Sequence, residues 1–238
     1  MRAPRTARGP RIVSDPARSI EQRVDDAFCA LIGDAGFPCL AAKGAVHRRD
    51  YQLGVYGALG SAEASDALAF DLAGFTRQSP PDGDRFTAFV AVFTGRAPAS
   101  ERAFERRLWM QLQRLHERDD SAVGWDPAVS ANPDDPRFSF SFGGCAFFIV
   151  GLNPRSTRIA RRFHWPALVF NPHAQFERLR REGRFERLRE QIRERDIALQ
   201  GSPNPNLADF GERSEARQYS GRDLSAAEWR CPFHMRTR

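Results

Sequence analysis

The chain has 238 residues, of which 41% are hydrophobic and 28% charged, an ordinary composition for one sizeable globular domain. The longest apolar runs, such as residues 145–152, are far shorter than the roughly 20 residues of a transmembrane helix, so we expect no membrane association. The N-terminus has no apolar leader segment, and none of the four cysteines forms a C-x-x-C pair. We therefore expect a cytoplasmic protein with reduced thiols and no structural zinc site.

The formal net charge of +6 and the isoelectric point near 9.7 raise the question of nucleic-acid binding. Several arginines lie in the N-terminal segment, and many others alternate with glutamate, as in residues 180–196. Such alternation is typical of a solvated helix face with ion pairs along it. A basic nucleic-acid binder without a cofactor therefore stays an alternative, but we do not expect specific nucleic-acid binding.

The organisation is predicted to be a disordered basic tail over residues 1–18 and one domain over residues 19–238. The tail is rich in proline and arginine and has no periodic apolar residues. The first helix should begin at Ser19, because Ser19 and Gln22 have the spacing of a capping box and apolar residues follow at helical intervals.

The next segments alternate between helix and strand patterns. Residues 37–61 are punctuated by glycine and contain only short strand-like pieces, and a helix is expected from about Ser65. Residues 85–93 are β-branched and aromatic and predict a strand. Ser100 is a suitable N-cap for a third helix with an apolar stripe.

The clearest local pattern is a predicted hairpin. Phenylalanines alternate with serines over residues 138–142, which places three rings on one face of a strand. Gly143 and Gly144 suit a two-residue turn, and an apolar return strand follows. Residues 166–170 predict one more strand.

A long helix is predicted after that strand, with Asn171 as its N-cap, Pro172 at its first position and Gly183 as a weak point. The remaining residues have few periodic apolar positions, so we expect an extended C-terminal tail that wraps a preformed core. Strands grouped between helices predict an α+β fold, with a mostly antiparallel sheet flanked by helices.

Two histidines are candidates for chemistry. His173 is predicted to be the second residue of its helix, where the positive end of the helix dipole lowers the pKa of an imidazole and keeps it neutral. A neutral imidazole can bind a metal, so His173 is a candidate haem-iron ligand, unless it only bonds to backbone. His116 is expected in the last turn of its helix, which favours the protonated form and a role as proton donor or propionate partner.

The other candidates are a thiol and a polar C-terminal segment. Cys39 is an alternative iron ligand as a thiolate, or a small buried apolar residue. Arg217 is a candidate for a substrate carboxylate or a haem propionate. Carboxylates that suit a cationic substrate, if they are not part of a solvated loop, are Asp209, Glu212 and Glu215.

These motifs together resemble the YqcI/YcgG family. The matching stretches, in the family's order, are FPC at 37–39, FSFSFGG at 138–144, FNPHAQFERLR at 170–180, NPNLADFGERSEARQYSGR at 204–222 and WRCPFH at 229–234. The resemblance runs from about residue 20 to residue 234. It implies haem binding and, as in characterised members, oxygen-dependent N-hydroxylation of a guanidine group on arginine or a related compound.

The resemblance therefore predicts a haem-dependent monooxygenase that uses haem b, O₂ and an external electron donor on a small guanidino or amino-acid substrate. The resemblance also favours His173 as the iron ligand, with His116 and Cys39 as alternatives. Two further readings remain: a haem-dependent enzyme with another nitrogenous substrate, and a non-catalytic haem-binding or haem-sensing protein. An oligomer is possible in each case.

Overall fold

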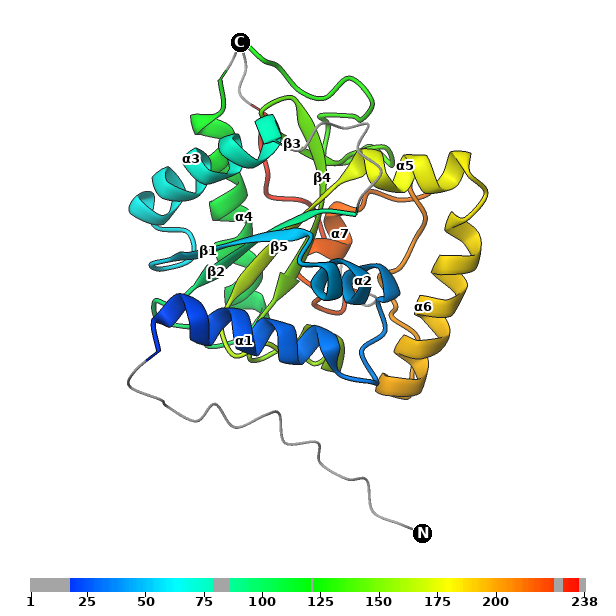
Figure 1. The fold of residues 1–238 in the computed structure, drawn as a ribbon. Coiled ribbons are helices and arrows are strands. Elements are labelled where there is room, and N and C mark those ends of the chain that lie inside the picture. The colour runs from blue at the N-terminus through cyan, green and yellow to red at the C-terminus, as the bar shows by residue number, and fades with distance from the viewer. Residues whose placement is uncertain (1–17, 79–85, 121, 225–228, 236–238) are drawn as a thin grey trace.

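The computed structural model describes residues 18–78, 86–120, 122–224 and 229–235 (Figure 1). The predicted disordered tail over residues 1–18 therefore lies almost wholly outside the described residues. The helices are α1 Ile20–Gly33, α2 Leu40–Arg48, α3 Ala62–Gln78, α4 Glu101–Arg118, α5 His173–Arg181, α6 Phe185–Gln200 and α7 Ala216–Tyr219, with a 3-10 turn at Ile159–Arg161. The strands are β1 Tyr51–Tyr56, β2 Ala88–Phe93, β3 Phe140–Phe142, β4 Cys145–Leu152 and β5 Ala167–Pro172.

The five strands form one sheet in the order β1-β2-β5-β4-β3. Only β1 and β2 pair in parallel, and the other three pairings are antiparallel, so the predicted α+β fold with a mostly antiparallel sheet is confirmed. Within the described residues, no helix is long and apolar enough to cross a membrane.

The two faces of the sheet carry separate cores because successive strand residues point to opposite faces. On β2, Phe89 and Ala91 pack with α3 and α4, while Val90 and Val92 pack with α1. The first core also takes in α7 and Phe233 from the C-terminal segment. The predicted wrapping of the core by that segment is therefore confirmed for its described residues.

Local sequence signals placed several elements correctly. Ser19 caps α1 and forms the predicted capping box with Gln22, and Ser100 caps α4. The two-residue turn between β3 and β4 has φ of 58° at Gly143 and 72° at Gly144. Both values lie in the left-handed region that glycine adopts without strain, which explains the pair of glycines.

Two predictions need correction. Residues 40–48 form helix α2, where only glycine-punctuated strand-like pieces were expected. Asn171 does not cap the next helix: it belongs to β5, its side-chain amide donates to the carbonyls of Phe148 and Val169, and Pro172 is the cap of α5. His173 is therefore the first helical residue, and the long helix is divided into α5 and α6 at Gly183, which has φ of 66°.

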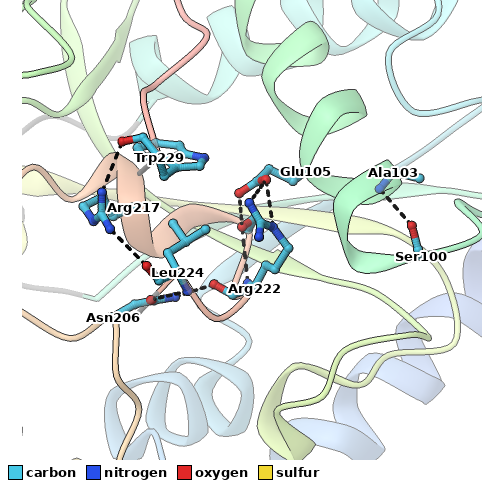
Figure 2. Close-up of polar contacts among 9 residues, drawn as sticks. Ser100, Ala103, Glu105, Asn206, Arg217, Arg222, Leu224 and Trp229 are labelled. Atoms are coloured by element: carbon cyan, nitrogen blue, oxygen red, sulfur yellow. Dashed lines mark hydrogen bonds and ion pairs between the residues drawn. The ribbon is translucent and has the colours of Figure 1, made fainter. Parts of the chain in front are cut away.

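A buried ion pair holds the C-terminal segment against α4. Arg222 donates from Nε and Nη2 to Oε2 of Glu105, at 2.9 and 2.7 Å, and Ser220 donates to Oε1 of the same carboxylate at 3.0 Å (Figure 2). Asn206 donates from its side-chain amide to the carbonyl of Arg222 and accepts from the backbone N–H of Leu224. These contacts fix the segment that supplies one wall of the cavity described below.

Candidate functional site

A cavity of about 260 Å³ lies between the sheet and helices α2, α5 and α6, and the C-terminal segment closes it with residues 207–210, 215 and 218. In Figure 1, α5 and α6 form a bend on the side of the molecule away from α3. Most of the lining is apolar, with a few polar groups among aromatic rings, which is the usual make-up of a small-molecule site. The aromatic residues in the lining are Phe148, Phe176, Phe185 and Phe210.

His173 borders this cavity at the start of α5 and is only 3% exposed. Its ring packs on Phe210, with 4.5 Å between the ring centroids. Nε2 lies 3.2 Å from Oε1 of Glu177 but is not aligned for a hydrogen bond, and it has no other partner among the described residues. Burial lowers the pKa of His173, partly opposed by the charge of Glu177. The imidazole is therefore neutral at pH 7 and has a lone pair for a metal.

Glu215 also borders the cavity, and it is 4% exposed at the N-cap of α7. Its Oε1 accepts hydrogen bonds from the hydroxyl of Ser139 at 2.6 Å and of Tyr219 at 2.7 Å. Burial raises the pKa of Glu215 to about 7, although these two hydrogen bonds act in the opposite direction. A carboxyl group that titrates near neutral pH inside a cavity is typical of a functional site.

The charges around the rim are paired with one another. Asp209 forms ion pairs with Arg189 and, at 3.4 Å, with Arg193, both from α6. Arg180 of α5 pairs with Glu177 and lies over the ring of Phe185, with 4.2 Å from its Cζ to the ring centroid. Three arginines and one neutralised aspartate therefore surround a cavity whose interior is apolar.

Cys39 brings a thiol to the same cavity from the N-terminus of α2. Its Sγ accepts a hydrogen bond from the backbone N–H of Ala42 at 3.5 Å. Burial raises the pKa of the Cys39 thiol, and the N–H groups of the first turn of α2 partly oppose this. A helix N-terminus favours the thiolate form of a cysteine. A cation near Sγ would therefore deprotonate this thiol more readily than it would a thiol in an apolar core.

The structure thus brings four of the predicted residues together, namely His173, Cys39, Asp209 and Glu215. The other three predicted residues, Glu212, Arg217 and His116, do not line the cavity. Glu212 is exposed, and its carboxylate accepts from the backbone N–H of Asp209.

Arg217 and His116 are the remaining two. The guanidinium of Arg217 donates to the carbonyls of Trp229 and Leu224, both at 3.3 Å, and does not line the cavity (Figure 2). His116 lies in α4, on the other face of the sheet, among the rings of Trp125 and Phe233. A role for His116 in the chemistry of this cavity is therefore not supported by its position.

Sequence reasoning missed three arginines that line the cavity and two residues behind it that bind Glu215. Ser139 and Tyr219 hold Glu215, and both looked like sheet and tail residues with no special role. The arginines at 180, 189 and 193 were hidden in the charge alternation of α5 and α6. For Arg189 and Arg193 of α6, helical spacing relative to Phe185 and Leu188 is the signal that could have indicated a shared face; Arg180 lies in α5, beyond the break at Gly183.

Within the described residues, no three His, Cys, Asp or Glu side chains lie close enough together to hold a bare metal ion. A haem needs only one or two axial ligands from the protein. The groups that fit a haem are the buried imidazole of His173, whose Nε2 has no hydrogen bond within the described residues, the aromatic walls, and the rim arginines, which suit propionates.

Comparisons with known proteins identify a family model and two relatives of this chain. The YqcI/YcgG family model matches residues 28–234. The uncharacterised protein YcgG of Bacillus subtilis is 27% identical over 206 residues, which cover 83% of this chain and 80% of that protein. The uncharacterised protein YqcI of the same organism is 31% identical over 135 residues, 55% of this chain and 52% of that protein. No solved structure matches. The chain belongs to the YqcI/YcgG family.

Proposed function

We propose that the cavity binds haem b and that the protein is a haem-dependent monooxygenase, which N-hydroxylates a small guanidino compound in the cytoplasm. The observation that carries the proposal is the buried Nε2 of His173, which borders a mostly apolar cavity and which, apart from its 3.2 Å contact with Oε1 of Glu177, has no hydrogen-bond partner among the described residues. A buried polar atom without a partner costs free energy, and a metal bond would offset that cost.

Bound haem would supply O₂ activation, with one oxygen atom inserted into an N–H bond and the other released as water, using two protons and two electrons from an external donor. The residues of the chain have three tasks. His173 would hold the iron, Arg180 and Arg193 would pair with the propionates, and the aromatic walls would exclude water. The ion pairs of Arg180 with Glu177 and of Arg193 with Asp209 keep both arginines beside the cavity. Each arginine could exchange its carboxylate partner for a haem propionate.

Haem fills more space than the cavity offers, so its binding requires α6 to move outward. The structure suits such a movement. No residue of α6 is buried, and the helix is bounded by Gly183 and by Gly201, with φ of 66° and 80°. Its main polar attachments to the rest of the fold are side-chain contacts: Arg158–Asp196, Arg189–Asp209, Arg195 to the carbonyls of Ala35 and Phe37, and Gln200 to Ile159 and Thr157.

The turnover test uses the haem-loaded protein with arginine, O₂ and a chemical reductant, and mass spectrometry of the product. We expect arginine heavier by one oxygen atom, with the label incorporated from ¹⁸O₂ and not from water. Absence of oxygenated product from arginine and from smaller guanidino compounds, in protein that binds haem, would contradict the monooxygenase proposal.

Cys39 is the second candidate ligand, because its Sγ borders the same cavity at a helix N-terminus. The ferrous–CO spectrum separates the two ligands. A peak near 420 nm is expected for imidazole, and a peak near 450 nm would assign the iron to the Cys39 thiolate. A haem-sensing protein would give the second spectrum without turnover.

A further inference from the structure

The sequence offered three carboxylates of the C-terminal segment that could bind a cationic substrate. Their surroundings in the structure show which of them is available to do so. Asp209 is already neutralised by Arg189 and Arg193, and Glu212 is exposed outside the cavity. Glu215 is the one carboxyl group that both borders the cavity and has no ion pair among the described residues.

The hydrogen bonds of Glu215 leave one oxygen available. The hydroxyls of Ser139 and Tyr219 both donate to Oε1, and Tyr219 is itself fixed by the backbone N–H of Phe140, 3.0 Å from its hydroxyl oxygen. No hydrogen bond to Oε2 is found in the described part of the chain. The carboxyl group is therefore held at one oxygen by two fully buried side chains, with the other oxygen left for a ligand.

The environment would favour a cation over a neutral ligand at this position. A buried carboxylate without a counter-ion is costly, because it loses its hydration and gains no opposite charge. A guanidinium suits such a carboxylate, since its planar N–H groups match the carboxylate geometry, and it also stacks on aromatic faces. Phe148 and Phe210 provide such faces in the same cavity.

Resting on the proposed function, we propose that Glu215 is the residue that recognises the cationic end of the substrate and selects small guanidinium compounds over their neutral analogues. Ser139 and Tyr219 are its positioning residues: they hold Oε1 and do not themselves contact the ligand. Substrate selection would then depend on the N-cap of α7, held by Tyr219 of α7 and by Ser139 just before β3, while iron binding would depend on α5.

A consequence is that ligand binding is linked to proton release. Because the pKa of Glu215 is about 7 and a cation binds only the ionised carboxylate, binding at acidic pH must displace a proton. Affinity should therefore fall by about tenfold from pH 8 to pH 6. The other titratable and charged groups around the cavity are His173 and Arg180 of α5, Arg189 and Arg193 of α6, Cys39 of α2, Asp209, and Tyr219 of α7.

The test is titration calorimetry of the full-length protein with arginine and with citrulline, which replaces the guanidinium by a neutral urea group of similar shape. Wild-type protein should bind arginine at least tenfold more tightly than citrulline at pH 8, with the expected weakening at pH 6. Glu215→Gln should lose both the preference and the pH dependence. Glu212→Gln is the matched control, and it should bind as the wild type does.

Ser139→Ala keeps the test decisive if Glu215→Gln does not fold. Loss of one donor to the carboxylate raises the pKa of Glu215 further, so the pH midpoint of arginine binding should move upward. Equal binding of arginine and citrulline, arginine binding by Glu215→Gln at wild-type affinity, or no arginine binding by the wild type would each overturn the inference.

The haem spectrum of the same samples distinguishes this inference from the proposed function. A Soret band without arginine selectivity would refute the role of Glu215 and leave haem binding intact. Arginine selectivity that depends on Glu215 without a Soret band would support the inference and refute the haem proposal.

Discussion

Replacement of Arg222 by alanine tests how the C-terminal wall of the cavity is held in place. The side chain of Glu105 is only 8% exposed, and two of its three hydrogen bonds come from the guanidinium of Arg222. The substitution leaves a buried carboxylate with the single hydroxyl of Ser220. Breaking a buried pair typically costs 3–5 kcal/mol. Arg222 is 18% exposed, so water can partly replace it, and we expect a loss of about 2–3 kcal/mol in the free energy of unfolding.

The assay is urea unfolding followed by tryptophan fluorescence at pH 7. With a slope of about 3 kcal/mol per molar urea, the midpoint should fall by about 0.7–1 M. The matched control is Arg184→Ala, whose ion pair with Glu182 is exposed on both sides and should contribute less than about 1 kcal/mol. If Arg222→Ala lost no more stability than this control, the ion pair would not be what fixes the segment.

Three further predictions concern the stability of the purified protein. Gly151→Ala should lose about 1–3 kcal/mol in urea unfolding, because its new Cβ would lie 2.7 Å from the carbonyl oxygen of Tyr219. The lowered pKa of His173 means that the unfolded chain takes up the proton first, so stability should fall below about pH 6.5, and His173→Gln should reduce that loss. The raised pKa of Glu215 acts in the opposite direction: stability should fall by about 3 kcal/mol between pH 4.5 and 7, and Glu215→Gln should abolish this decline.

The elements that sequence predicted well are those with local signals. The capping box at Ser19, the cap at Ser100 and the glycine pair at 143–144 each act within a few residues, and all three are found in the structure. Helix α2 was missed because it is only nine residues long and contains Gly44, which disfavours a helix. Asn171 looked like a cap, but its amide is used by the neighbouring strand, which no local pattern reveals.

The candidate site depended even more on distant contacts. His173 and Glu215 were both identified as candidates, but only the folded chain shows that they share a cavity with Cys39, which is more than 130 residues away in sequence. The local sequence also does not show which of Asp209, Glu212 and Glu215 is available to a cationic substrate. It is decided by Arg189, which neutralises Asp209, and by Ser139, which binds Glu215.

The most direct measurement for the central claim is a haem titration of the purified protein followed by its Soret absorbance. The wild type should bind one haem per chain, His173→Ala should lose or strongly weaken the band, and His116→Ala, altered on the other face of the sheet, should bind as the wild type does. A wild-type protein that is folded and shows no Soret band with excess haem would contradict the account. So would a band that is abolished by His116→Ala and unchanged by both His173→Ala and Cys39→Ala.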